Sequence, residues 1–197
     1  MVETLDRREP GVVVYLIKWA NDLRSPKRMY TKLIRRPGLW ESDLDQENLK
    51  ELISDHASSP RNKYRMEHAT CTCHGKNPLC GDEVTFYINL SPSTSIIDEI
   101  AFEGRGCPIS QASASLVTQV CGGLSRDEAK TLSNHLRGTI TGMTQNPIDE
   151  TLKAAWTEVE TLTTIQINPA RVKCITLAWH TLNHALDGHI ETDISSN

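Results

Sequence analysis

Apolar and polar residues alternate strictly between Val84 and Leu90, which places Val84, Phe86, Ile88 and Leu90 on one face of an extended segment. Ser91-Pro92-Ser93 follows as a turn, and a second apolar segment runs from Ile96 to Phe102. The pattern predicts an antiparallel β-hairpin. A third strand is expected around residues 68–74.

A helical period replaces the alternation after Cys107. Pro108 suits a first helical position, and apolar residues recur at helical spacing up to Val120. Ser125 and Glu128 form a capping-box pattern that predicts the start of a second helix. Further helices are expected from Asn146-Pro147, from Asn168-Pro169 to about Gly188, and earlier over residues 43–57. Strands followed by helices predict an α+β fold, a small antiparallel three-stranded sheet packed with helices.

Charge divides the 197-residue chain unevenly. Residues 1–40 hold nine Lys or Arg against four Asp or Glu, although the whole chain has a net charge of −4. We therefore predict a basic, poorly ordered N-terminal extension at 1–40, a domain at 41–188 and a C-terminal tail at 189–197. A translation start at Met29 is an alternative reading of the first segment.

Composition narrows the function classes. An acidic chain without a clustered basic face is not typical of a nucleic-acid-binding protein. No apolar run approaches the roughly 20 residues of a membrane span, and the acidic N-terminus does not resemble a secretory signal. We expect a cytoplasmic protein with no membrane partner, whose six cysteines are reduced or metal-bound rather than paired in disulfides.

Three cysteines and one aspartate lie in distinctive local motifs. Cys80 and Asp82 belong to Asn-Pro-Leu-Cys-Gly-Asp at 77–82, Cys107 follows Gly-Arg-Gly, and Cys174 ends Pro-Ala-Arg-Val-Lys-Cys. Three sulfurs and one carboxylate are a complete ligand set for tetrahedral zinc. Residues two apart in extended backbone face the same side, so Cys80 and Asp82 can reach one ion. Cys107 is expected to cap a helix N-terminus, where a thiolate is favoured.

Other thiols and histidines offer weaker sites. Cys71 and Cys73 could form a rival metal site with two flanking histidines, His68 and His74, but strand alternation also explains their spacing. Cys121 is expected in the core. His180 and His184 have a spacing that zinc can use, yet they lack a third ligand and are expected on a solvated helix face.

The motifs together resemble the U-type iron–sulfur cluster assembly family, which comprises SufU, IscU and the N-terminal domain of NifU. The resemblance covers about residues 44–187 and rests on five segments: Ser59-Pro60-Arg61-Asn62-Lys63, residues 77–82, Phe102–Cys107, Ile109–Ser115, and Arg171-x-x-Cys174-x-x-Leu177-x-Trp179. Lys173 before the last cysteine and the long segment between Cys107 and Cys174 favour the SufU branch. Pro108, the extra thiols Cys71 and Cys73, and the basic extension depart from the family pattern.

The resemblance implies an IscU/SufU-like fold and a zinc site made of Cys80, Asp82, Cys107 and Cys174. It also implies a zinc-dependent sulfur acceptor, sulfurtransferase-like rather than a conventional turnover enzyme. Its sulfur would come from a SufS-type, pyridoxal-phosphate cysteine desulfurase. Cys80 is the expected acceptor, Arg171 the expected partner contact, and downstream iron–sulfur assembly or acceptor proteins the expected recipients.

Two alternatives stay open at this point. A scaffold could bind iron and assemble a [2Fe–2S] cluster on Cys80, Cys107 and Cys174, because such clusters also use thiolate ligands. A purely structural zinc domain could act as an adaptor, although closed structural sites favour Cys and His over Asp.

Overall fold

The computed structural model describes residues 12–13, 34–35, 41–143, 147–167 and 169–193. Internal contacts divide the chain into two units, Met1–Asp43 and Leu44–Asn197. In the first unit, β1 (Val12–Val13) pairs antiparallel with β2 (Ile34–Arg35). Most of the predicted basic extension lies outside the described residues, as does the end of the predicted tail, residues 194–197.

The second unit contains a four-stranded sheet in the order β5-β4-β3-β6. β3 (Cys71–Asn77), β4 (Asp82–Leu90) and β5 (Ile97–Arg105) are antiparallel neighbours, as the hairpin pattern predicts. β6 (Glu191–Asp193) pairs parallel with β3 at the sheet edge. The prediction of three antiparallel strands is therefore one strand short. The segment Glu191-Thr192-Asp193 is too short and too polar to show the apolar alternation that predicts a strand.

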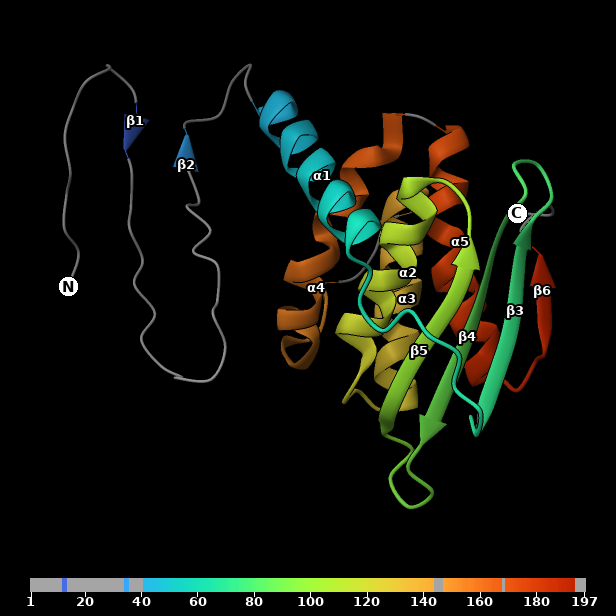
Figure 1. The fold of residues 1–197 in the computed structure, drawn as a ribbon. Coiled ribbons are helices and arrows are strands. Elements are labelled where there is room, and N and C mark those ends of the chain that lie inside the picture. Colours follow the sequence, from blue (N-terminus) through green and yellow to red (C-terminus); the bar gives the residue numbers. More distant parts are fainter. Residues whose placement is uncertain (1–11, 14–33, 36–40, 144–146, 168, 194–197) are drawn as a thin grey trace. The chain divides into compact units, whose positions relative to one another are not determined.

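Helices cover one face of this sheet (Figure 1). α2 (Pro108–Cys121) and α5 (Pro169–Leu186) lie against the strands, and α3 (Arg126–Ile140) packs on α5. α1 (Glu41–Ser58) precedes the sheet in the chain. The α+β prediction is confirmed. Both hydrogen bonds of the capping box join Ser125 and Glu128 at the start of α3, as predicted.

The predicted third helix is not continuous. It divides into η1 (Glu150–Leu152), α4 (Lys153–Val159) and η2 (Glu160–Ile167), with 3₁₀ turns on both sides of one short α-helix. Two threonine hydroxyls in η2 donate to carbonyls three residues earlier, Thr163 to Glu160 and Thr164 to Thr161. Such side-chain bonds compete with regular α-helical geometry. The apolar positions Leu152, Val159 and Leu162 are nevertheless buried, as predicted.

The core lies between the sheet and the helices. Val84, Phe86 and Ile88 are buried, and the rings of Phe86 and Phe102 stand 6.2 Å apart between centroids. Gly75 allows α5 to approach β3 closely, because a Cβ there would overlap the side chain of Thr181. Thr181 is two helical turns beyond Cys174. This close contact sets the position of α5 relative to the end of β3, where the candidate site lies.

Candidate metal centre

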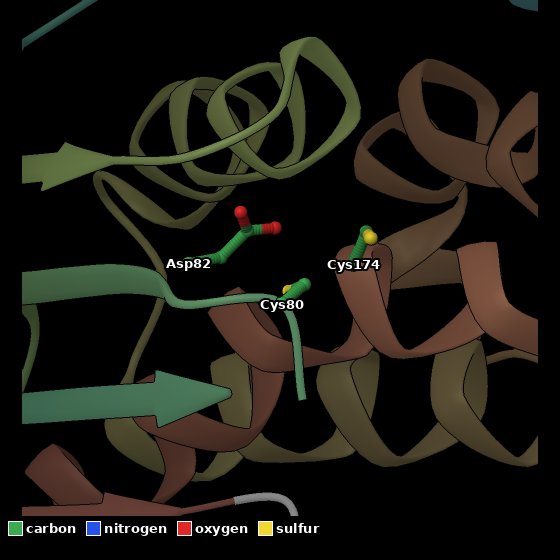
Figure 2. Close-up of side chains that lie close together, drawn as sticks. All are labelled: Cys80, Asp82 and Cys174. Atoms are coloured by element: carbon green, nitrogen blue, oxygen red, sulfur yellow. The ribbon is translucent and has the colours of Figure 1, made fainter. Parts of the chain in front are cut away.

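Side chains of Cys80, Asp82 and Cys174 converge at one end of the sheet (Figure 2). One ligand atom from each lies within 4.8 Å of the others, and no other group of three or more Cys, His, Asp or Glu in the described ranges does so. Cys80 belongs to the turn between β3 and β4, Asp82 begins β4, and Cys174 lies in the second turn of α5. Segments distant in sequence thus meet at one point.

The β3–β4 turn is built around the buried side chain of Asn77. Its Oδ1 accepts a hydrogen bond from the backbone N–H of Leu79 at 3.1 Å, and its carbonyl accepts one from Gly81 at 2.8 Å. Gly81 has φ +74°, a left-handed conformation that favours glycine. The turn leaves Cys80 exposed while Asp82 is only 4% exposed.

Only one of the two carboxylate oxygens of Asp82 has a hydrogen-bond partner among the described residues. Its Oδ1 accepts a hydrogen bond from the backbone N–H of Cys107 at 3.1 Å. Its Oδ2 is buried and has no hydrogen-bond partner among the described residues. A buried carboxylate oxygen without a partner is costly, so this atom is a natural ligand for a cation. The donor set of sulfur and carboxylate oxygen suits zinc.

Cys107 is the N-cap of α2, as predicted, and its Sγ accepts a hydrogen bond from the backbone N–H of Ser110 at 3.5 Å. Its sulfur is not among the three atoms that lie within 4.8 Å of one another. It is nevertheless adjacent, because the backbone N–H of Cys107 bonds Asp82 Oδ1 and the charge of Cys107 contributes to the raised pKa of Cys174. The structure thus brings three of the four predicted ligand residues together and places Cys107 beside them.

Gly106 lets α2 start this close to the carboxylate. A Cβ at this position would stand 2.6 Å from Asp82 Oδ1 and 2.7 Å from its Cγ. Neither Gly106 nor Asn77 was predicted as a site residue. Both belong to the motifs that carry Cys107 and Cys80, which is the signal that could have identified them.

Without a cation, the thiols of Cys80 and Cys174 favour the protonated form. Burial raises the pKa of Cys174 to about 12, and the neighbouring Cys107, Asp82 and Cys80 add to the effect. Burial also raises the pKa of Cys80, partly offset by a backbone hydrogen bond at Asp82. A bound cation reverses this preference, because metal ligation requires thiolates.

Arg171 and Lys173 lie beside the site on α5. Arg171, the predicted partner contact, is exposed in the turn before Cys174, and Lys173 is half-buried. A cationic group is therefore accessible within one helical turn of the buried thiol.

The rival thiols do not form a second site. Cys73 and Cys121 are fully buried, and burial raises their pKa to about 11 and about 12. The alternative group of Cys71, Cys73, His68 and His74 is not assembled within the described part of the chain. Cys121 is a core residue, as expected.

The prediction that His180 lies on a solvated face is wrong. Its side chain is buried, its Nε2 stands 2.9 Å from Thr192 Oγ1, and its ring stands 4.4 Å from that of His184. The reason is β6, which covers this part of α5. His184 is half-buried.

None of the helices in the described ranges combines the length and apolar composition of a membrane span.

Comparison with known proteins gives the family. The model of the NifU-like N-terminal domain matches residues 48–193. The iron–sulfur cluster assembly scaffold protein IscU of Thermotoga maritima is 38% identical over 136 residues, which are 69% of this chain and 90% of that protein. The zinc-dependent sulfurtransferase SufU of Bacillus subtilis is 32% identical over 133 residues, 68% of this chain and 85% of that protein.

Solved structures agree with this assignment. The crystal structure of SufU from Fervidobacterium islandicum, a scaffold protein of the SUF system, has a TM-score of 0.61 and 32% identity, and the match covers 69% of this chain and 94% of that one. The NifU-like N-terminal structure from Brucella abortus has a TM-score of 0.63 at 16% identity, covering 75% and 96%, which shows the shared fold. The chain therefore belongs to the NifU-like N-terminal domain family, alongside the IscU and SufU iron–sulfur cluster assembly proteins.

Proposed function

We propose that this protein is a zinc-dependent sulfur acceptor in iron–sulfur cluster assembly, with Cys80 receiving sulfur from a cysteine desulfurase. The observation that carries the proposal is the asymmetry of the site. Cys80 is exposed, whereas Asp82 and Cys174 beside it are buried. One thiol can therefore be reached by another protein while the other groups remain inside the fold.

Zinc fits the residues present. Cys80, Asp82, Cys107 and Cys174 would hold it, and Asp82 Oδ2 lacks any other partner among the described residues. Zinc bound there would supply the positive charge that keeps the thiols deprotonated near neutral pH. The Cys107 N–H holds the carboxylate in position, and the Asn77 turn leaves Cys80 exposed beside it.

Sulfur transfer to Cys80 is a thiol–disulfide exchange on a persulfide. The Cys80 thiolate attacks the outer sulfur of the desulfurase persulfide and forms a new S–S bond. The original S–S bond breaks, and its electron pair leaves with the desulfurase cysteine as a thiolate. Cys80 becomes a persulfide, and no external oxidant or reductant is needed.

The partner we propose is a SufS-type cysteine desulfurase, with Arg171 as a charged contact beside the site. Downstream iron–sulfur assembly or acceptor proteins would take the sulfur from Cys80. The protein is thus a sulfurtransferase-like carrier. A reducing compartment such as the cytoplasm suits this role, since the acceptor thiol must remain free.

A second candidate is a scaffold that assembles a [2Fe–2S] cluster, its cargo, on Cys80, Cys107 and Cys174. The observation that favours it is the greater identity to an IscU scaffold, 38%, than to SufU, 32%. A purely structural zinc adaptor is less well supported, because a closed structural site has no need of an exposed thiol ligand.

Metal analysis of anaerobically purified protein, followed by a desulfurase assay, tests the proposal. The acceptor predicts colourless protein with one zinc per chain and faster alanine release from cysteine by the desulfurase. Cys80→Ser should abolish the stimulation, while Cys71→Ser, a thiol outside the site, should retain it. Brown protein that donates its cluster to an apo-protein would support the scaffold, and full stimulation by Cys80→Ser would support the adaptor.

A further inference from the structure

Leu79, the residue before Cys80, directs a large apolar side chain into solvent. It is 75% exposed, and of the large apolar side chains in the described ranges only Ile190, at 77%, is more exposed. Most apolar side chains of this size are buried in the core between sheet and helices. An exposed leucine immediately beside an acceptor thiol therefore calls for an explanation in terms of binding.

The exposure of Leu79 follows from the turn that carries it. Its backbone N–H is bonded to the buried Asn77 side chain at 3.1 Å, and Gly81 closes the turn with a 2.8 Å bond to the Asn77 carbonyl. Pro78 further restricts the backbone at this position. Leu79 is thus presented by a preformed turn, which lowers the ordering cost of any contact it makes.

The chemistry at Cys80 determines what covers Leu79. Sulfur transfer requires the donor sulfur to approach Cys80 to bonding distance, about 2.05 Å for an S–S bond. Consecutive Cα atoms are about 3.8 Å apart. A protein that delivers sulfur to Cys80 therefore comes within about one residue's length of Leu79 and can cover it, whereas a small persulfide need not.

We propose that Leu79 is an apolar anchor that docks this protein on the cysteine desulfurase, in an apolar pocket next to the persulfide-bearing cysteine. This inference rests on the proposed sulfur-acceptor function. A few side chains in fully desolvated pockets near the centre of an interface carry most of its binding energy, and full burial of a leucine side chain contributes roughly 1.5–3 kcal/mol. Arg171, exposed on α5 three residues before Cys174, would be a polar contact at the rim of this interface.

The test is a titration of the desulfurase with full-length Leu79→Ala, measuring alanine release from cysteine. Truncation of Leu to Ala removes part of a side chain worth roughly 1.5–3 kcal/mol when fully buried. We expect about a tenfold higher half-saturating concentration, which corresponds to about 1.4 kcal/mol. Maximal stimulation should be unchanged, because the acceptor thiol and its ligand neighbours are intact. Leu79→Met should restore most of the affinity.

Ile190→Ala is the matched control, since Ile190 is equally exposed but precedes β6 outside the turn. Its half-saturating concentration should equal that of the wild type. The docking role of Leu79 is refuted if Leu79→Ala has the half-saturating concentration of the wild type. It is also refuted if Leu79→Ala and Ile190→Ala lose affinity equally. Zinc content and Cys80 alkylation by iodoacetamide should match the wild type in Leu79→Ala; a change in either would also refute a pure docking role.

The two proposals fail in different ways. If Cys80→Ser stimulates the desulfurase fully, the sulfur-acceptor function itself is wrong. If Cys80→Ser is inactive but Leu79→Ala binds normally, only the anchor is wrong. Sulfur transfer from a small inorganic polysulfide gives a third check, because the anchor predicts equal rates for Leu79→Ala and the wild type.

Discussion

The backbone N–H of Cys107 donates a hydrogen bond to Asp82 Oδ1 over 3.1 Å, which ties the start of α2 to the start of β4. The bond orients the carboxylate so that Oδ2 remains buried without a partner among the described residues. Outer contacts of this kind orient metal ligands and tune their affinity. The pair therefore links the fold around α2 to the ligand function that we propose for Asp82.

Replacing Asp82 separates these two roles. Asp82→Asn retains a carbonyl oxygen for the Cys107 N–H but loses the charge, so we expect near-normal thermal stability with zinc affinity lowered on the order of tenfold or more. Asp82→Ala loses both the bond and the ligand and should also melt at a lower temperature. Competition with a chromogenic chelator and thermal melts measure the two effects. Unchanged zinc affinity in both variants would remove Asp82 from the site.

Gly106→Ala tests the close approach of α2 to the carboxylate. The added Cβ would lie 2.6 Å from Asp82 Oδ1, so the helix start or the carboxylate must move. We expect a loss of about 1–3 kcal/mol in unfolding free energy together with weaker zinc binding. Urea unfolding and zinc titration measure these changes.

Gly122→Ala is the control for Gly106→Ala. Gly122 is the C-cap at the other end of α2 and has φ −61°. A Cβ added there would come no closer than 3.7 Å to the nearest atom, the Thr118 carbonyl oxygen. Its stability and zinc affinity should match those of the wild type. Equal effects of the two substitutions would mean that the contact with Asp82 is not the cause.

Local sequence patterns predicted the helices and strands whose position depends on their own residues rather than on contacts with distant segments. Alternation from Val84 to Leu90 gave β4, and the Ser125–Glu128 capping box gave the start of α3. β6 was missed because three polar residues carry no apolar period, and it forms through pairing with β3. The same strand explains the error at His180, because only tertiary structure reveals that a distant strand covers it.

The candidate site was predictable as a set of residues but not as an arrangement. The motifs singled out Cys80, Asp82, Cys107 and Cys174. The structure brings ligand atoms of Cys80, Asp82 and Cys174 within 4.8 Å of one another and places Cys107 beside them. Their relative positions depend on contacts between elements far apart in sequence. Gly75 and Gly106 are required because a Cβ there would overlap Thr181 or Asp82. These contacts join segments far apart in sequence, so they cannot be predicted from the sequence.

Gly75→Ala tests how α5 is positioned. The added Cβ would overlap the Thr181 side chain, so α5 must move away from β3, and Cys174 moves with it. We expect the unfolding free energy to fall by about 3 kcal/mol or more, because overpacked cores typically lose about 1–3 kcal/mol and this overlap is severe. Zinc affinity should fall as well. Thermal melts and chelator competition provide the measurements.

Thr181→Ala in the Gly75→Ala background distinguishes steric overlap from other effects. Removing the hydroxyl and methyl groups relieves the worst overlap, although the Thr181 Cβ would still lie 2.9 Å from the new atom. We therefore expect partial recovery of both stability and zinc affinity. A double variant no better than Gly75→Ala would contradict this account.

Stability should depend on pH through His56, which is buried between α1 and α2 with its Nδ1 2.9 Å from Ser115 Oγ. Burial, helped by the charge of Arg61 and opposed by that of Asp55, lowers its pKa from 6.5 to about 4. The folded protein thus holds a neutral imidazole where the unfolded chain binds a proton. This contribution is complete above pH 6.5 and is lost as pH falls toward 4, by about 1.4 kcal/mol per pH unit and about 3 kcal/mol in total.

Urea unfolding of the wild type and of His56→Gln between pH 7.5 and pH 4 measures this contribution. Gln cannot be protonated but can still hydrogen-bond Ser115, which also accepts the Arg61 backbone N–H at 2.8 Å. Other groups titrate equally in both proteins, so the difference between the two curves isolates His56. The wild type should lose about 3 kcal/mol more than the variant across this range. Parallel curves would mean that His56 binds its proton in the folded protein as readily as in the unfolded chain.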